Sequence, residues 1–370
     1  MHLQLDEQYP VDVSSGTFSF FLFPVVHMRV LVAMSGGVDS SVAAALLLQQ
    51  GCNVEGINLR LASGGCSSRD AAQNVCDRLQ IPLRCIDVQA EFSREVIQNF
   101  ISEYQQGRTP NPCVRCNHII KFGLLMDYAR KHAFDRLATG HYARIEHDDS
   151  QSQFLLKQAR DHSKDQSYFL YRLSQEQMQM LLFPVGDLSK KEVRAYAHTL
   201  QLPSAESPES QEICFIEHHN YRLYLKHHAP ETLVPGNLIL SDGTIVGHHE
   251  GIAFFTVGQR RKLGVAAGER LYVLKIEPDT HAVVLGKKAE LEKKELTVAQ
   301  THFIYQKRRE SSREVMVKIR YRSPFVPAHL YPLDPDRTRV IFKQPVSGIC
   351  PGQAAVFYDG DVVVGGGIIE

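Results

Sequence analysis

The sequence predicts an α/β protein in which an N-terminal domain with a doubly wound parallel sheet precedes a small central domain and a C-terminal β-barrel-like domain. From Met28 to about residue 140, short apolar runs rich in β-branched residues alternate with segments of helical spacing. Such alternation is typical of a parallel sheet covered by helices. After about residue 217, short alternating runs separated by turn residues replace the helical spacing, which indicates a β-rich remainder.

The parallel sheet is predicted from four strands and the helices between them. The strands are expected at 29–34, 54–61, 83–88 and 136–141, and the helices at 39–50, 68–80, 91–105 and 118–132. A further helix is expected to begin in "SYFLYRLSQEQM". In the remainder, "PGNLILSDGTIVG" predicts a hairpin with a Ser-Asp-Gly turn, and "VMVKIRYR", "RVIFKQPV" and "QAAVFYDGDVVVGGGIIE" predict barrel strands. A ligand is expected at the carboxyl ends of the parallel strands.

Composition and charge restrict the partners. Lys+Arg and Asp+Glu are equal at 41 each, so an RNA partner must be held by local patches rather than by a global field. Eight cysteines are scattered through the chain and no signal peptide is predicted, which favours free thiols in a reducing cytoplasm. The apolar stretch "FSFFLFPVV" is much shorter than the roughly 20 residues of a membrane span, so no membrane association is expected.

The most informative stretch is "VLVAMSGGVDSSVAAALL", a buried strand that runs through a Ser-Gly-Gly turn into an alanine-rich helix. Two glycines let backbone N–H groups approach an anion, and the start of the helix adds unpaired donors, so a phosphate fits there. A plain glycine turn with a serine cap is the alternative. The loop lacks the lysine of the GxxxxGK[ST] motif and resembles the pyrophosphate-binding (PP) loop of the ATP pyrophosphatases. That resemblance implies transfer of AMP from ATP to a substrate oxygen.

The loop residues give a predicted ATP site. They are Ala33, Met34, Ser35, Gly36, Gly37, Val38, Asp39, Ser40 and Ser41. Asp39 is placed to assist Mg²⁺ or the pyrophosphate, although a simple first-turn acid that favours the helix dipole is the alternative.

Two cysteines stand two residues apart in "TPNPCVRCNHIIKFG". Cys113 and Cys116 are compatible with half of a zinc site, a disulfide or the working thiols of an enzyme. A zinc site requires further ligands, for which His118 and Cys214 are candidates. The pair alone leaves these possibilities open.

Further motifs follow the phosphate loop in a fixed order. They are "GRTPNPCVRCNHIIKFG", "ATGHYAR", "KDQSYFLY", "LFPVG", "EICFI", "TVGQRRKLGV", "KIRYRSP", "PGQAAVFY" and the terminal "GGGIIE". Together they resemble the tRNA-specific 2-thiouridylases, the MnmA family, over Met28 to Glu370. The resemblance implies ATP-dependent 2-thiolation of the wobble uridine (U34) in the tRNAs for Lys, Glu and Gln. It implies ATP with Mg²⁺ as substrate, no permanent cofactor, and a sulfur-donor protein fed by a cysteine desulfurase.

The resemblance also implies roles for individual residues. Cys116 matches the family's nucleophile and Cys214 its persulfide carrier, and the two are expected to close a disulfide after turnover. Leu59 and Gly140 match positions that approach the nucleotide. The expected tRNA contacts are Asn111, Pro112 and Cys113 at the target base, then Lys164, Asp165 and Gln166, and then Arg320 and Tyr321. Cys113 stands where many relatives have Asp, which puts an acid/base role at that position in doubt because a thiol is not equivalent to a carboxylate.

Several of these features have a structural alternative. Lys164 and Asp165 also suit the cap of a following helix. The basic clusters Arg260-Arg261-Lys262 and Lys307-Arg308-Arg309 suit either phosphate contacts or solvated surface. Structural cysteines are expected at positions 52, 76, 85 and 350, and Cys66 is expected in a loop.

These expectations divide the chain into four regions. They are an N-terminal extension at 1–27 that is disordered or precedes the natural start, a PP-loop adenylation and thiolation domain at 28–217, a central tRNA-binding domain at 218–285, and a β-barrel domain at 286–370. Two other functions remain open: a PP-loop ligase that acts on a small molecule, and a zinc-stabilised RNA-binding module.

Overall fold

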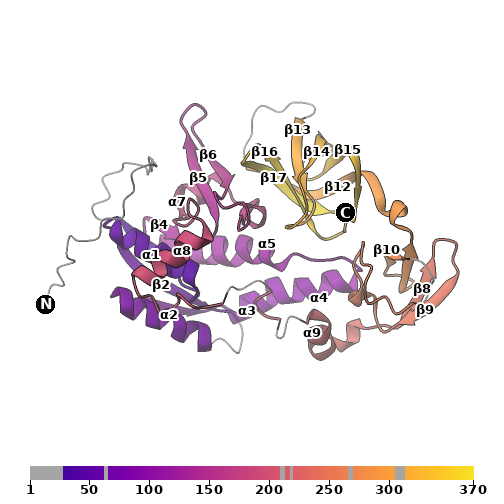
Figure 1. Ribbon diagram of the computed structural model, residues 1–370, viewed down its shortest axis with the longest axis horizontal. Helices are drawn as coiled ribbons and strands as arrows, with labels where there is room; N and C mark the ends of the chain where they lie inside the picture. Colours follow the sequence, from indigo (N-terminus) through magenta and orange to yellow (C-terminus); the bar gives the residue numbers. More distant parts are fainter. Residues whose placement is uncertain (1–27, 62–65, 209–212, 217–219, 266–269, 305–312) are drawn as a thin grey trace.

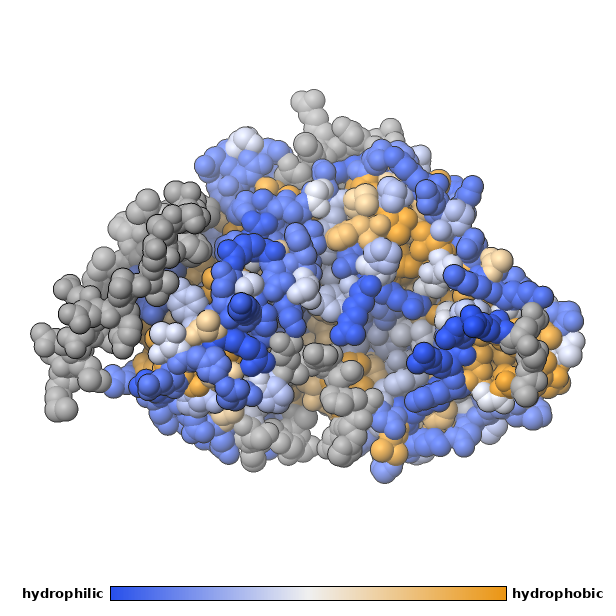
Figure 2. All heavy atoms as spheres, in the orientation of Figure 1, coloured by the Kyte–Doolittle hydropathy of each residue, from blue (hydrophilic) through white to orange (hydrophobic). Residues whose placement is uncertain are grey.

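The computed structural model describes residues 28–61, 66–208, 213–216, 220–265, 270–304 and 313–370. The predicted extension at 1–27 and the basic cluster at 307–309 lie outside these ranges. Figure 1 shows three parts: a helix-covered parallel sheet, a closed barrel above the long helical segment that contains α5, and a small sheet beside the barrel. Hydrophilic side chains cover most of the visible face, with apolar patches over the barrel and the small sheet (Figure 2).

The N-terminal sheet is parallel, with the strand order β3-β2-β1-β4-β7. Its strands are β1 (Arg29–Ala33), β2 (Asn53–Arg60), β3 (Leu83–Asp87), β4 (Arg136–Ala138) and β7 (Leu181–Leu182). Val30 and Val32 pack in one core cluster and Leu31 in another, so β1 is buried on both faces. Chain order reverses between β1 and β4, which is where doubly wound sheets bind ligands. The predicted fold class is confirmed.

Helical segments lie between these strands and after the last of them. They are α1 (Val38–Gln49), α2 (Cys66–Leu79), α3 (Gln89–Phe92), η1 (Ser93–Ile97), α4 (Gln98–Gln105), α5 (Pro112–Cys116), η2 (Asn117–Leu124), α6 (Leu125–Lys131), η3 (Ser167–Leu170), α7 (Gln175–Met180) and α8 (Lys190–Thr199). The segments η1 and η2 are π-helical.

Four sequence-based predictions of secondary structure were wrong. Cys66 begins α2 rather than lying in a loop. The helix expected at 118–132 begins at Pro112, because proline suits the first helical position and Asn111 caps it. The strand expected at 136–141 ends at Ala138. "SYFLYRLSQEQM" is not one helix, because Ser174 forms a capping box that starts α7 after a separate short 3₁₀ turn.

The central part is a four-stranded sheet of order β10-β11-β8-β9. Its elements are α9 (Tyr221–His228), η5 (Pro230–Thr232), β8 (Gly236–Leu240), β9 (Ile245–His249), η6 (Ile252–Phe254), β10 (Tyr272–Glu277) and β11 (Ala282–Gly286). β8 and β9 form the predicted antiparallel hairpin, and Gly243 in its turn has a positive φ of 89°.

The C-terminal part is a closed antiparallel barrel. It contains η7 (Lys288–Leu291), β12 (Glu292–Phe303), β13 (Arg313–Lys318), β14 (Val326–Pro332), β15 (Thr338–Ser347), β16 (Ala354–Asp359) and β17 (Val362–Ile369). Pairing of β12 with both β15 and β17 closes the ring. The hairpin of β5 (Ala143–Asp148) and β6 (Gln153–Gln158) extends this sheet, since Lys157 pairs with Val362. The sequence analysis did not predict this pairing.

The loop before α5 joins all three parts. The backbone N–H of Thr109 donates to Pro351 O at 2.8 Å, and the amide of Gln353 donates to Thr109 O at 2.9 Å and to Pro110 O at 3.1 Å. On the central part, Thr256 Oγ1 accepts a hydrogen bond from Thr109 Oγ1 at 3.3 Å. The entry to α5 is therefore fixed by contacts between domains.

In the ranges that the structure describes, no helix is long and apolar enough to cross a membrane.

Replacing Gly352 by alanine should loosen this junction. Gly352 has a φ of +88°, and a Cβ there would lie 2.9 Å from Thr109 N. Gly360, with a φ of +60° and open space around it, is a matched control, because alanine at either position carries the strain of a positive φ, about 1 kcal/mol. We expect Gly352→Ala to lower the melting temperature more than Gly360→Ala and to speed proteolysis near residue 109. Equal effects of the two substitutions would contradict this.

Candidate functional site

The phosphate loop connects β1 to α1. Gly36 has a φ of +81°, and a Cβ there would lie 2.7 Å from Ala71 Cβ, so only glycine fits. Gly37 precedes α1 without a side-chain cap, which leaves the first N–H groups of the helix uncapped by a side chain. The hydroxyls of Ser40 and Ser41 donate to Gly37 O at 3.0 and 2.9 Å and so fix the turn. The loop has the geometry of an anion cradle.

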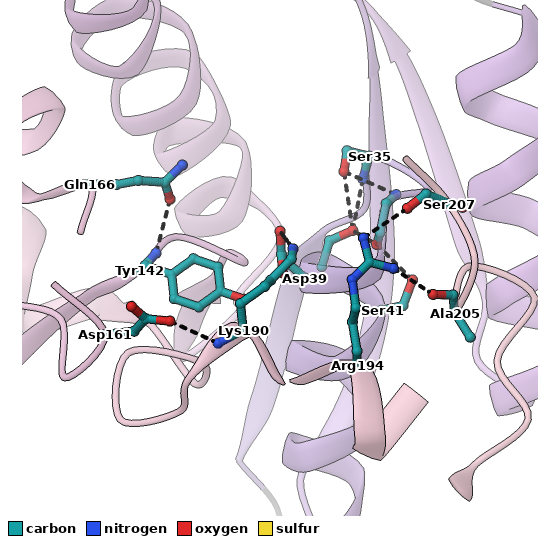
Figure 3. A network of polar contacts seen from close by, with 12 residues as sticks. Ser35, Asp39, Ser41, Tyr142, Asp161, Gln166, Lys190, Arg194, Ala205 and Ser207 are labelled. Atoms are coloured by element: carbon teal, nitrogen blue, oxygen red, sulfur yellow. Dashed lines mark hydrogen bonds and ion pairs between the residues drawn. The ribbon is translucent and has the colours of Figure 1, made fainter. Parts of the chain in front are cut away.

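Asp39 projects from the first turn of α1 into a polar cluster (Figure 3). Its carboxylate accepts hydrogen bonds from Lys190 Nζ at 2.6 and 2.8 Å and from Tyr142 Oη at 2.7 Å. The backbone N–H of Lys190 in turn donates to Asp161 at 3.0 Å. The Lys190 side chain is 12% exposed and the Asp39 side chain 33%, so this ion pair is partly shielded from solvent. A cation therefore stands beside the phosphate loop.

Gly140 lies directly on the first turn of α1. A Cβ at this position would lie 2.6 Å from Asp39 C and from Ser40 N, both of which are backbone atoms that cannot move away independently. The turn after β4, Thr139 to His141, therefore packs against the phosphate loop.

The other predicted nucleotide residues have buried or partly buried side chains. Met34 is 2% exposed, and its carbonyl accepts a hydrogen bond from Asn58 Nδ2 at 2.7 Å, so its side chain belongs to the core. Leu59, at the carboxyl end of β2, is partly buried between two core clusters. Ala33, the last residue of β1, packs against the same core as Leu59, and Val38 is buried at the start of α1.

Cys113 and Cys116 lie on helix α5, and Cys214 is close enough to act electrostatically on both thiols. Cys113 and Cys214 are exposed, whereas Cys116 is 8% exposed. Phe215 anchors the Cys214 segment by edge-on contacts with Phe92 and Phe100, at centroid distances of 5.7 and 5.3 Å. The two cysteines expected to exchange sulfur are therefore held on one side of the domain although 98 positions separate them in the sequence.

Burial controls the protonation of these thiols. It raises the pKa of Cys116 to about 12, and the neighbouring Cys214 and Cys113 add to that rise. Packed protein also raises the pKa of Cys113 and of Cys214, although both residues reach solvent. The ammonium of Lys121 lowers the pKa of all three thiols, but less than burial raises it. At neutral pH the thiols are therefore protonated in this state.

The zinc alternative finds no support in the described ranges, where no three His, Cys, Asp or Glu residues are grouped to hold a metal ion. Burial lowers the pKa of His118 to about 4, and the charges acting on it come from Arg172, His302 and Arg115 rather than from the thiols. Its Nδ1 atom is buried without a hydrogen-bond partner.

The segment 164–166 is mostly engaged inside the protein. Asp165 is 4% exposed, and its carboxylate accepts hydrogen bonds from Ala159 N at 3.0 Å and from Ser167 Oγ at 2.9 Å. Gln166 exchanges two hydrogen bonds with the backbone of Tyr142, at 2.8 and 2.9 Å. Asp165 also accepts from Ser167 N at 3.2 Å at the start of η3, which matches the capping alternative.

Arg320 and Tyr321 lie where the barrel meets its neighbours. The Arg320 guanidinium donates to Val257 O at 2.8 Å and to Gly348 O at 2.7 Å, and so links the barrel to the central part. The Tyr321 ring packs on Phe169 at a centroid distance of 4.4 Å. Arg320 therefore holds the barrel to the central part, and Tyr321 holds it to the N-terminal part.

The structure also describes one predicted basic cluster and the four cysteines predicted to be structural. Arg260, Arg261 and Lys262 are exposed. Cysteines 52, 76 and 350 are buried, as expected for structural residues, but Cys85 is exposed because β3 is an edge strand of the sheet. Cys85 was therefore misassigned.

Sequence reasoning missed the contacts made by distant residues. Lys190 and Tyr142 reach Asp39 from 151 and 103 positions away, and Lys121 reaches His141 at 3.5 Å. The local sequence around Lys190 indicates only the start of a helix, with Ser189 as its N-cap, and does not indicate a contact with Asp39.

Known proteins resemble the chain along nearly its whole described length. Residues 28–218 match the family described as tRNA methyl transferase HUP domain, 222–287 its PRC-barrel domain, and 293–369 the aminomethyltransferase beta-barrel domain. A tRNA-specific 2-thiouridylase MnmA of Acetivibrio thermocellus is 42% identical over 92% of this chain and 99% of its own. The protein of that name from Moorella thermoacetica is 44% identical over 92% and 99%. The one from Desulforamulus reducens is 42% identical over 93% and 98%.

Alkylation should reveal the order of thiol reactivity. Iodoacetamide reacts with the thiolate, so a raised pKa slows the reaction at a given pH and the rate climbs about tenfold per pH unit below the pKa. We expect peptide mapping at pH 7 to 9 to show exposed Cys85 modified first, then Cys113 and Cys214, and Cys116 last. Modification of Cys116 before Cys85 would contradict the pKa of about 12.

Proposed function

The chain belongs to the tRNA-specific 2-thiouridylase family, and from that premise we propose that it catalyses ATP-dependent 2-thiolation of the wobble uridine, U34, in the tRNAs for Lys, Glu and Gln. The observation that carries the proposal is the combination, in one domain, of a phosphate cradle with a group of thiols from two separate segments. The matching domain families bear methyltransferase descriptions, but the full-length relatives are named for thiolation, and paired thiols suit sulfur transfer.

The first half of the reaction activates the base. The C2 carbonyl of uridine is a poor electrophile without a leaving group, and transfer of AMP to its oxygen supplies one. We assign the pyrophosphate of ATP to the loop around Gly36 and Gly37, because uncapped N–H groups there suit an anion. Lys190 would neutralise phosphate charge, and Asp39 would meet Mg²⁺ when Lys190 turns to the phosphates. When bound, Mg²⁺ shields the charge that develops on the phosphates.

The second half delivers sulfur. A donor protein fed by a cysteine desulfurase leaves a persulfide on Cys214. Its terminal sulfur attacks C2 and AMP departs, after which the Cys116 thiolate attacks Cys214 Sγ. The S–S bond to the transferred sulfur breaks, its electron pair leaves with 2-thiouridine, and a Cys116–Cys214 disulfide forms. Alternatively, Cys116 attacks first and releases the sulfur as hydrosulfide. Either route consumes two electrons per cycle, which a thiol reductant restores.

We assign the tRNA to the surface at which Cys113 and Cys214 are exposed. Asn111, Pro112 and Cys113 would contact the flipped base, since α5 begins there. Lys164 and the exposed cluster Arg260-Arg261-Lys262 would contact phosphates. Residues 28–217 would carry the chemistry, 218–285 would bind tRNA, and the barrel at 286–370 would hold the junction.

The other residues expected to contact tRNA make contacts inside the protein, which favours a supporting role over direct contact with tRNA. We propose that Asp165, Gln166, Arg320 and Tyr321 position the tRNA-binding elements, because their side chains are engaged within the protein. The reducing cytoplasm suits a protein with this many free cysteines.

The thiol assignment is tested by Cys214→Ser and Cys116→Ser. With ATP, Mg²⁺, a cysteine desulfurase system and unmodified tRNA for Glu, both variants should form no 2-thiouridine, measured by mass spectrometry of digested RNA. Binding of tRNA should persist, because neither serine removes a domain contact. Cys85→Ser, on the edge strand, is the control and should retain full activity. Thiolation by either active-site variant would refute the assignment.

The adenylation site is tested by Lys190→Met. Loss of the cation should lower tRNA-dependent AMP release by about 10²-fold, the usual cost of removing one electrostatic donor. Lys191→Met removes the same charge at an exposed neighbouring position and should be nearly silent. AMP release without any tRNA would instead favour a small-molecule substrate.

A further inference from the structure

We propose that Lys121 is the cation that stabilises the thiolates of Cys116 and Cys214 during sulfur transfer. This rests on the proposed function and assigns a residue to its second half. Lys121 lies in η2, which continues α5 without a break.

The π-helical form of η2 directs Lys121 toward the thiols. In an α-helix, residues five apart are rotated by about 140° around the axis, because each residue turns the chain by about 100°. A π-helix closes i→i+5 hydrogen bonds instead and so brings such residues toward the same face. Cys116 immediately precedes η2 and Lys121 is five residues later. The unusual helix therefore aligns the cation with the buried thiol.

A buried histidine holds the ammonium in place. His141 is 9% exposed, its Nε2 lies 3.5 Å from Lys121 Nζ, and its Nδ1 lies 2.6 Å from Thr139 Oγ1. Burial, with help from Lys121, lowers the pKa of His141 well below its usual range, so the ring is neutral. A neutral ring that donates from Nδ1 to Thr139 leaves Nε2 to accept from Lys121.

Among the residues that the structure describes, no carboxylate forms an ion pair with Lys121, whereas Asp39 takes Lys190 and Glu95 takes Arg115. The titratable groups that face it are His141 from the turn after β4, Cys113 and Cys116 from α5, and Cys214 from the opposite segment. The charge of Lys121 therefore acts on all three thiols and lowers their pKa values.

The step that forms the disulfide places negative charge on sulfur beside this cation. Cys116 must lose its proton to attack Cys214 Sγ, a new S–S bond forms between the two cysteines, and the departing sulfur takes the electron pair of the broken persulfide bond. A nearby ammonium favours both anions. It also opposes the effect of burial on Cys116, whose pKa is raised to about 12 even with Lys121 lowering it.

The test replaces Lys121 by methionine, which keeps the length and removes the charge, and by arginine, which restores it. Lys131→Met, at the exposed end of α6, is the matched control. Iodoacetamide modification of Cys214 and Cys116 is followed by peptide mapping from pH 6.5 to 9.5, together with the melting temperature. One pKa unit changes the thiolate fraction tenfold, and the lower nucleophilicity of a more acidic thiol offsets part of this. We expect Lys121→Met to slow both reactions by about threefold to tenfold at pH 7.5.

Further outcomes separate this role from a structural one and from the proposed function. Lys121→Arg should restore the alkylation profile, and Lys131→Met should leave it unchanged. In single turnovers of persulfide-loaded protein, Lys121→Met should slow 2-thiouridine formation while ATP-driven AMP formation proceeds. An unchanged alkylation profile in a folded Lys121→Met variant overturns the proposal. Alkylation uses no tRNA or ATP, so it decides the role of Lys121 even if the unsubstituted protein does not thiolate tRNA.

Discussion

The hydrogen bonds that fix the loop before α5 are the constraint on which the rest of the structure depends. Thr109 and Pro110 are held by Gln353 of the barrel, and Thr109 also meets Thr256 of the central part. Because α5 begins two residues later, the barrel and the central part determine where Cys113 and Cys116 point. Contacts from all three parts therefore contribute to the position of these two cysteines.

One short turn links the two chemical halves of the site. Gly140 packs on the backbone of Asp39 and Ser40, and the next residue, His141, contacts Lys121. The phosphate loop and the thiol group are therefore mechanically connected through adjacent residues after β4. A movement of the phosphate loop would reach Lys121 through this turn, so the structure connects the proposed nucleotide site with the thiol group.

The sequence predicted those features that local pattern determines. Apolar runs and helical spacing located β1 to β3 and α1, and the two loop glycines indicated the phosphate cradle. Contacts over more than a hundred positions, such as Asp39 with Lys190, leave no local pattern. The π-helical register of η2 and the burial of Asp165 were equally invisible, because propensity does not distinguish a π turn from an α turn or a capping carboxylate from an exposed one.

The central claim is that one protein joins adenylation to sulfur transfer between two cysteines. The most direct measurement is a single turnover of protein carrying a labelled persulfide, with ATP, Mg²⁺ and unmodified tRNA for Glu, in which all products are counted. We expect equal amounts of AMP, labelled 2-thiouridine at the wobble position and Cys116–Cys214 disulfide. Labelled 2-thiouridine without AMP, or without that disulfide, would contradict the account.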